Sequence, residues 1–410
     1  MRGRVAILVV VAAQAQEIPP VDPLLAKISS NAIENQRVLP NYTCSETIER
    51  FEKPGKNKPF ERMDIVRLEV AYVEGKELFG WPGSSSLREP EMSKLVSGAT
   101  GNGDFGLLPK VIFVKRSAAI GAAAVTEHQG KVAWRYDYRV AADKHAFRVT
   151  GPIGSADVGF HGSFWVDAAT LDVLRIEGLA DDIRADTGLL SVDLVVDYAR
   201  TAIGRSTFLL PVGSERTIIG LHDITHRNVT RFSDCRQFVG ESVLTFGDPL
   251  PAPGSVIAPP PRTDANLPND FVVGVRIETP IDSQSSAVGD IVKAVLRSPV
   301  MDHHEAVLPK GARLMARVAR LERLASSVAL ELKFTDIEFE GGHASLEGRE
   351  NRAMLHQTYF AKEFHSASAM TRFWPQILTF RGKRFVLGSG TDLMFRSRLL
   401  KSEEHDPIHR

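Results

Sequence analysis

The stretch FHGSFWVDAATLDVLRIEG, residues 160–178, decides the fold. Two runs rich in aromatic and β-branched residues, 160–166 and 171–177, flank the short polar segment Asp167-Ala168-Ala169-Thr170. Such runs joined by a few turn residues are typical of an antiparallel β-hairpin. Its strands would place one face on a core and the other in water.

The same pattern extends along the chain on both sides of this hairpin. Apolar and polar residues alternate or continue as strand-like runs at residues 66–72, 134–138, 189–200 and 206–210. Consecutive strands with short connections form an antiparallel sheet. Ahead of them, Asp22-Pro23 is a helix start and Leu39-Pro40 ends that helix. We therefore expect a mainly β protein whose N-terminal domain, residues 22–247, is a curved antiparallel sheet with a few helices.

One face of this sheet is unusually apolar. We expect it to form a concave surface for a lipid or other hydrophobic ligand, made by Trp134, Tyr136, Tyr138, Phe164, Val192, Leu194, Val196 and Tyr198. The single helix after Asp22 is too small to cover this surface. In the alternative interpretation, residues 91–96 and 107–115 form further helices that fill the concavity and leave an ordinary closed core.

A helix followed by a long antiparallel sheet, with the hairpin residues 162–167 and 174–177, resembles the lipoprotein-carrier (LolA-like) superfamily. The resemblance implies, for residues 22–247, a half-closed sheet that wraps an apolar ligand beneath a helical lid. The opening LPNYTC, residues 39–44, also resembles the start of many exported bacterial proteins.

Prolines mark a boundary in the middle of the chain. They stand at positions 249, 251, 253, 259, 260, 261 and 268, which indicates a semi-rigid linker over residues 248–270. The region that follows, residues 271–400, is again mostly strand-like. Its apolar parity shifts after Thr335-Asp336, which predicts a bulge or bend in a strand. Residues 320–330 fit either a helix or two strands joined by a turn.

Three motifs follow the linker in a fixed order: Ile281-Asp282-Ser283 at a strand end, the turn Gly289-Asp290, and Leu308-Pro309-Lys310-Gly311. A last strand-like piece covers residues 385–400. Together they resemble the C-terminal β-domain of the TrbI family, which belongs to the outer-membrane core of type IV secretion systems. The resemblance implies a small β-barrel or sandwich over residues 271–400, a turn within 320–330, and a short tail at 401–410.

This chain departs from that family pattern in two places. The family anchors through an N-terminal membrane helix and inserts a helical hairpin through the outer membrane. Here residues 352–378 occupy the insertion point and carry charged side chains such as Lys362, Glu363 and Arg372, which cannot cross lipid. The resemblance therefore implies a small β-domain in this chain and does not imply a role in conjugation.

The N-terminal residues of the sequence predict the cellular compartment of the protein. Arg2 and Arg4 precede a short apolar run, and Ala13-Gln14-Ala15 is a small-x-small cleavage site, so residues 1–15 read as a secretory signal peptide. No later segment reaches the roughly 20 apolar residues that a membrane-spanning helix needs. We expect a periplasmic or secreted protein.

Charge and cysteine content narrow the partners further. Fifty basic and fifty acidic residues give a formal net charge of +0. This balance does not favour binding to the negatively charged backbone of nucleic acid, so we do not expect nucleic acid as a partner. The two cysteines, Cys44 and Cys235, are expected to form a disulfide in an oxidising compartment. Two buried free thiols are the alternative.

The sequence contains no motif for a reaction, a cofactor or a metal. We expect a non-catalytic exported cell-envelope protein that binds a hydrophobic ligand or docks onto an envelope partner. The alternative is an exported hydrolase whose site is assembled from distant residues such as Asp181, His222 and His303.

Overall fold

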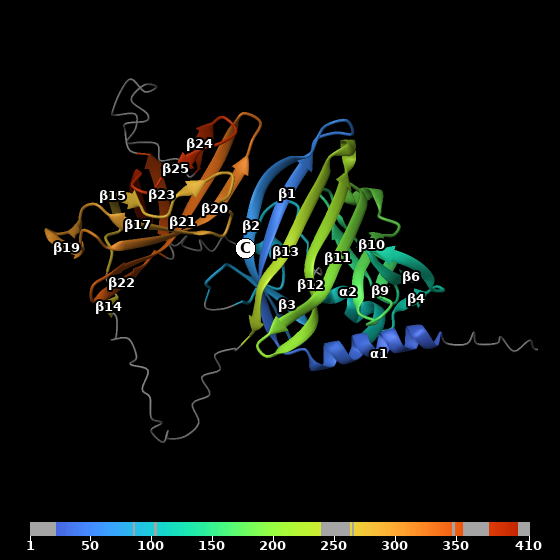
Figure 1. Cartoon of the computed structure of the whole chain (residues 1–410). Helices are drawn as coiled ribbons and strands as arrows, with labels where there is room; N and C mark the ends of the chain where they lie inside the picture. Colours follow the sequence, from blue (N-terminus) through green and yellow to red (C-terminus); the bar gives the residue numbers. More distant parts are fainter. Residues whose placement is uncertain are drawn as a thin grey trace, which may run out of the picture.

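The computed structural model describes residues 22–84, 87–101, 105–238, 263–264, 266–346, 349–355 and 377–400. The expected signal peptide, most of the expected linker and the tail at 401–410 lie outside these residues. The described chain is mainly β, with a curved antiparallel N-terminal sheet, a second smaller sheet and few helices, which confirms the expected fold class (Figure 1).

The first helix, α1 (Pro23–Val38), begins and ends where the sequence predicts. The Leu24 amide donates to Asp22 Oδ1 at 2.9 Å, so Asp22 caps the helix while Pro23 occupies its first position. Ile28 and Ala32 are buried on one face of the helix. This face packs across the inner side of the N-terminal sheet, with α1 along one end of the strands (Figure 1).

The N-terminal sheet has eleven strands, ordered β3-β2-β1-β13-β12-β11-β10-β9-β6-β4, with β5 also paired to β6. Its ladders are antiparallel throughout, and its first long strand, β1, lies beside its last, β13. The strands are β1 (Tyr42–Lys53), β2 (Glu61–Val73), β3 (Lys76–Gly80), β4 (Ala118–Ile120), β5 (Ala124–His128), β6 (Lys131–Val140), β9 (Phe160–Asp167), β10 (Val173–Ala180), β11 (Leu189–Ile203), β12 (Ser206–Gly220) and β13 (Thr225–Gln237).

Two sequence predictions concern this sheet directly. The hairpin β9–β10 turns at Asp167, whose Oδ1 accepts hydrogen bonds from the amides of Ala169 (2.8 Å) and Thr170 (3.1 Å). Cys44 on β1 and Cys235 on β13 form a disulfide with a Cα–Cα distance of 4.1 Å. A separate short hairpin, β7 (Phe147–Thr150) with β8 (Ser155–Val158), follows β6.

The second sheet has nine strands, ordered β14-β22-β21-β20-β17-β15-β26-β23, with β24 paired to β21. It curls on itself: Phe334 on β21 and Phe395 on β26 are far apart in this order, yet their ring centroids lie 4.5 Å apart. The strands are β14 (Thr263–Asp264), β15 (Asp270–Ile277), β17 (Ile291–Leu296), β20 (Arg313–Arg323), β21 (Ser327–Phe339), β22 (Gly342–Ser345), β23 (Arg349–Leu355), β24 (Leu378–Arg381) and β26 (Asp392–Leu399); the pairs β16 (Ile281–Asp282) with β25 (Val386–Leu387) and β18 (Val300–Asp302) with β19 (Glu305–Leu308) stand apart.

The second sheet also settles three details of the sequence analysis. Residues 320–330 are two strands joined by a turn and not a helix. The predicted bulge falls at Thr335, because Ala316 pairs with Phe334 whereas Met315 pairs with Asp336. One expectation needs correction: residues 263–264 lie within the expected linker but form β14, which pairs in parallel with β22.

The two sheets meet at an edge of β2. Strand β3 covers β2 only from Glu69 onward, and on the uncovered part the Arg67 amide donates to Val288 O while the Val288 amide donates to Ile65 O, both at 2.8 Å. Next to this bridge, Gly289 has φ +102°, and a Cβ there would lie 2.2 Å from Arg67 O. Asp290 forms an ion pair with Arg67. The Gly-Asp turn found in the sequence is therefore the contact point between the domains.

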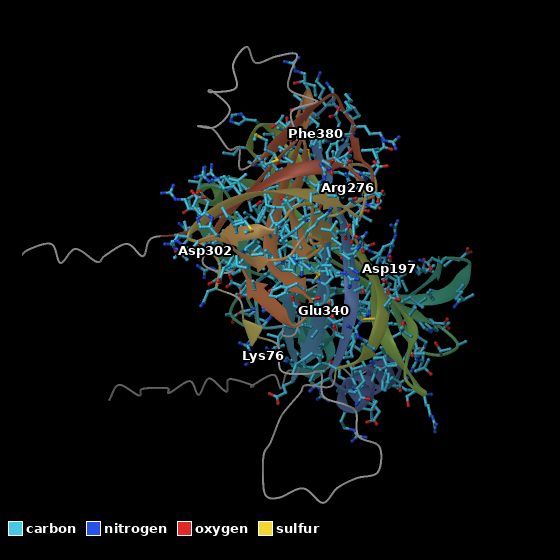
Figure 2. The ribbon with its side chains drawn as sticks, turned by 90° about the vertical axis from the view of Figure 1, so that its left-hand side faces the viewer. Lys76, Asp197, Arg276, Asp302, Glu340 and Phe380 are labelled. Atoms are coloured by element: carbon cyan, nitrogen blue, oxygen red, sulfur yellow. A yellow bond between two sulfur atoms is a disulfide. The ribbon has the colours of Figure 1, made fainter. Side chains whose placement is uncertain are left out.

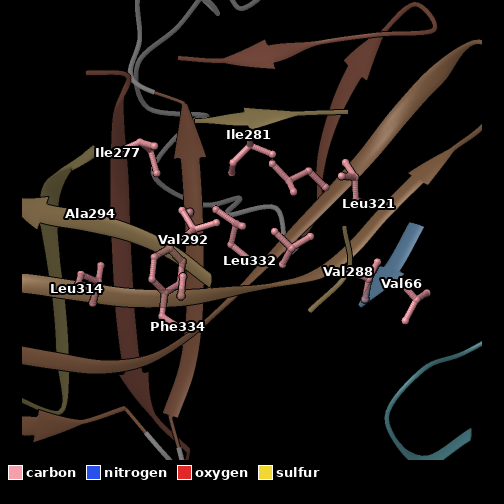
Figure 3. Close-up of a cluster of buried hydrophobic side chains, with 14 of the residues drawn as sticks. Val66, Ile277, Ile281, Val288, Val292, Ala294, Leu314, Leu321, Leu332 and Phe334 are labelled. Carbon is pink, nitrogen blue, oxygen red and sulfur yellow. The ribbon is translucent and has the colours of Figure 1, made fainter. Parts of the chain in front are cut away.

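Apolar packing continues through this contact. Val66 and Leu68 of β2 belong to the same buried cluster as Val288, Leu321 and Phe334 of the second sheet. Figure 3 shows Val66 and Val288 at the end of this cluster, next to the strands of the C-terminal domain. The two sheets thus share one apolar core, and residues 287–290 cover the free edge of β2.

Candidate functional site

The apolar face predicted from the sequence exists as one surface of the N-terminal sheet. Cross-strand pairing places Tyr136, Phe164, Ile176 and Val196 in one row across β6, β9, β10 and β11, and all four are fully buried. The Tyr136 and Phe164 rings stack at 5.1 Å. Tyr138, Leu194 and Tyr198 are buried on the same side.

Helices cover most of this surface. This agrees with the alternative interpretation of the sequence, in which further helices fill the concavity. The helical segment α2 (Leu107–Pro109) with η2 (Lys110–Val114) inserts Val111, Ile112 and Phe113, and Ile28 of α1 joins the same cluster. The Phe113 ring meets Phe164 edge-on at 5.2 Å. An open concavity over all eight predicted residues is therefore wrong, because side chains from these helices occupy the space.

Two of the eight predicted residues lie at the margins of the face. Trp134 is half-buried near the β5–β6 hairpin, where Val125 and Val132 are 67% and 62% exposed. Val192 is half-buried too, and it packs against a small cluster that includes Val149 and Val158 of the β7–β8 hairpin.

A cavity remains between α1, α2 and the sheet. Its volume is about 30 Å³, room for the centres of about two water molecules. Mostly apolar and aromatic side chains line it: Ala32, Asn35, Gln36, Leu39, Tyr42, Tyr72, Phe105, Gly106, Pro109, Val173, Tyr198, Leu209, Leu210 and Pro211. Of the residues predicted from the sequence, only Tyr198 contributes to it.

The polar side chains that line this cavity are neutral, and those of Asn35, Gln36 and Tyr72 are hydrogen-bonded. Asn35 Nδ2 donates to Leu209 O at 3.0 Å, and Asn35 Oδ1 accepts from the Leu209 amide at 2.9 Å. The Tyr72 hydroxyl donates to Gln36 Oε1 at 3.3 Å. Burial raises the pKa of Tyr42 and of Tyr72, so both phenols stay protonated at neutral pH. The cavity wall therefore carries no charge and suits an apolar molecule.

The residues of the alternative hydrolase site are not brought together. Asp181 interacts with its own neighbours, His161 Nδ1 at 2.5 Å and Arg139 at 3.0 Å. His222 lies in the turn between β12 and β13. His303 is in the β18–β19 turn of the other domain, with its side chain 97% exposed. Figure 2 shows the neighbouring Asp302 on the opposite side of the molecule from Asp197 of the N-terminal sheet.

The described residues contain neither a metal site nor a membrane-spanning helix. Among the described residues, no three His, Cys, Asp or Glu side chains are grouped so that they could hold a metal ion. Within the same part of the chain, no helix combines the length and apolar character needed to span a bilayer.

No protein-family model matches the chain, and no curated protein matches it. Solved structures with some similarity include a putative outer membrane lipoprotein-sorting protein domain from Vibrio parahaemolyticus, with 10% identity, 51% of this chain and 90% of that chain covered, and a TM-score of 0.27. A LolA superfamily protein from Nitrosomonas europaea has 11% identity, coverage of 52% and 93%, and a TM-score of 0.30. A DUF1329 family protein from Desulfovibrio piger has 15% identity, coverage of 54% and 95%, and a TM-score of 0.30.

These structures are what the chain resembles at a low level of similarity. Two of them carry the lipoprotein-sorting or LolA description expected from the sequence. At such TM-scores the likeness carries no argument about function. None of the three descriptions concerns a TrbI-type domain, so that resemblance for residues 271–400 stays a prediction.

Proposed function

We propose that the protein is a non-catalytic, exported binding protein that holds a hydrophobic molecule between α1 and the inner face of the N-terminal sheet. The observation that carries the proposal is the uncharged cavity beneath α1, with apolar and aromatic residues contributed by α1, α2 and five strands. Ligand sites of this kind are mostly apolar and lie where elements meet. Docking of the C-terminal domain onto an envelope partner remains a prediction from the sequence.

The cavity must enlarge to accept a ligand, because ligand pockets are usually of the order of 300–1,000 Å³. Helix α1 is the element that can move. It is joined to the sheet by few directional contacts, chiefly the Asn35–Leu209 pair at one end and the Tyr136 hydroxyl donating to Asp22 Oδ2 at 3.1 Å at the other. A ligand that inserts beneath α1 would replace the apolar contacts of Ile28 and Ala32 with its own surface.

A titration with a fluorescent fatty acid, together with native mass spectrometry of the purified protein, tests this proposal. The Ala32→Trp variant fills the cavity from α1 and is expected to weaken binding at least about tenfold, because overpacking a closed site costs about 1–3 kcal/mol. Ala26→Trp is the matched control, since Ala26 is exposed on the same helix. Absence of saturable binding in the wild type, or equal binding by both variants, would overturn the proposal.

A further inference from the structure

A row of polar side chains crosses the inner face of the N-terminal sheet where the apolar cluster ends. Direct cross-strand pairing places Asp64 (β2) opposite Arg50 (β1), Arg50 opposite Asn228 (β13), and Asn228 opposite Arg216 (β12). Three of the four are buried residues, and Arg50 forms a two-pronged ion pair with Asp64 at 2.7 and 2.5 Å. We call these four residues the polar row.

Burying such groups is unfavourable unless their hydrogen bonds are satisfied. In the apolar part of the same face, interdigitated side chains provide the cover. Residues 92–101, which we call the strap, lie over the polar row. The side chains of Met92 and Val96 are buried in the apolar cluster, whereas main-chain carbonyls from the following residues contact the polar row itself.

The strap follows the polar row residue by residue. Arg50 Nη1 donates to Ser97 O at 2.5 Å, and Asn228 Nδ2 donates to Ala99 O at 3.0 Å. At the next alternate position, Gly101 lies directly against the guanidinium of Arg216, where a Cβ would be 0.8 Å from Nη1. Residues 97, 99 and 101 thus contact side chains of successive strands of the sheet, with the chain bending at Gly98, whose φ is +88°.

Asn228 is the group that this arrangement leaves incomplete. It is only 7% exposed, and among the described residues its Oδ1 has no hydrogen-bond partner, although its Nδ2 donates to the strap. A side-chain amide can donate to a peptide carbonyl and accept from a peptide N–H at the same time. The strap uses only the donor, and a buried acceptor left unpaired costs about 1–3 kcal/mol.

We propose that the polar row is a binding site for a peptide segment of small residues, and that the strap occupies this site in the absence of such a peptide. Arg50 and Asn228 recognise peptide carbonyls, and a ligand peptide that also presents an N–H to Asn228 Oδ1 satisfies the site more completely than the strap does. This site is separate from the cavity beneath α1, so it does not depend on hydrophobic-ligand binding.

The test uses a fluorescently labelled peptide with the strap's own sequence, Ser-Gly-Ala-Thr-Gly, acetylated and amidated. In the wild type the tethered strap competes at an effective concentration in about the millimolar range. Gly98 has φ +88° and lies beside Arg50, so Gly98→Val is expected to release the strap. We expect this variant to bind the peptide at least about tenfold more tightly than the wild type.

Two further variants make the test specific. Gly130→Val is the matched control, because Gly130 also has a positive φ, +77°, but has no neighbour within 4 Å in the β5–β6 turn. Adding Asn228→Leu to Gly98→Val is expected to weaken peptide binding about tenfold. Equal binding by Gly98→Val and Gly130→Val, or no effect of Asn228→Leu, would overturn the proposal.

Should Gly98→Val fail to fold, hydrogen exchange on the wild type decides. Millimolar peptide is expected to raise the exchange rates of the strap amides at Leu95 and Val96, which donate to Met92 O in the closed strap, because the peptide displaces the strap. Unchanged rates at saturating peptide would contradict the proposed site.

Discussion

The apolar part of the inner face and the polar row belong to the same sheet but are covered in opposite ways. Over the apolar part, side chains such as Phe113 pack against Phe164. These contacts depend on the identity of the residues that make them. Over the polar row, carbonyl oxygens of Ser97 and Ala99 form the cover, and any peptide offers those groups. A cover made of side chains stabilises the fold, whereas a cover made of main chain can be exchanged for another chain.

The largest effect is expected where the side-chain cover is broken. Phe113→Ala should lower the free energy of unfolding by about 3–5 kcal/mol, because Phe113 is buried and its removal leaves a cavity. Urea denaturation measures this change. The neighbouring Val114 is exposed, so Val114→Ala is the control and should differ little from the wild type. A small loss for Phe113→Ala would mean that the helical cover is loosely packed.

A second change removes support from the end of the polar row, where β2 meets the C-terminal domain. Gly289→Val should lower stability by about 2–3 kcal/mol, because its φ of +102° is unfavourable for valine and its Cβ would meet Arg67 O. Gly311→Val has a similar φ, +87°, with open space around it, and should cost less. Equal thermal midpoints for the two variants would show that the domain contact is not tight.

The strap itself should matter less to stability than either of these sites. Gly98→Val is expected to cost about 1–2 kcal/mol, the value of the two hydrogen bonds that the strap carbonyls accept. Urea denaturation of Gly98→Val and of Phe113→Ala under the same conditions compares how much each cover contributes to the free energy of unfolding. If Gly98→Val lowered the free energy of unfolding as much as Phe113→Ala, the two covers would contribute equally to stability, contrary to the comparison above.

The smallest effect is expected at the β9–β10 turn, which lies outside both covers and serves as a reference. Hydrogen bonds from the Ala169 and Thr170 amides lower the pKa of Asp167, with Lys131 adding to the effect. A lowered pKa in the folded state means that the contribution is present above the unfolded value of about 3.9 and is lost as the pH falls through the folded value.

The Asp167→Asn variant should therefore lose this acid-dependent contribution while it keeps an acceptor for the turn. Urea midpoints measured from pH 7 down to pH 2 would show a smaller decline for the variant than for the wild type. Parallel declines would show that Asp167 does not titrate in this range.

Local patterns in the sequence predicted the elements that local geometry controls. Asp22-Pro23 marked the start of α1, Asp167 marked the hairpin turn, and the parity shift marked the bulge at Thr335. The polar row could not be found in this way. Arg50, Asp64, Arg216 and Asn228 are scattered over the sequence. Each resembles a solvent-facing residue of an alternating strand until the register of the four strands β1, β2, β12 and β13 is known.

The cavity and the strap escaped prediction for a similar reason. Residues 97–101 have no apolar period, so they read as a loop, and nothing local reveals that their carbonyls meet Arg50 and Asn228. The residues Trp134, Tyr136 and Tyr138, predicted from the sequence as part of a ligand-binding face, lie on the inner side of the sheet, and ligand binding there stays a prediction. Whether such a face is open or filled depends on helices elsewhere, for which the weak patterns at 91–96 and 107–115 were the signals.

The pairing of β1 with β13 has a consequence for the order in which the chain can fold. Strands that begin at Tyr42 and end at Gln237 lie side by side, so the edge of β1 stays unpaired until nearly the whole N-terminal domain is available. Contacts between residues so distant along the chain form slowly. Local hairpins such as β1–β2 can form early, but when the chain emerges from its N-terminus the second edge of β1 can pair only after residues 225–237 have arrived.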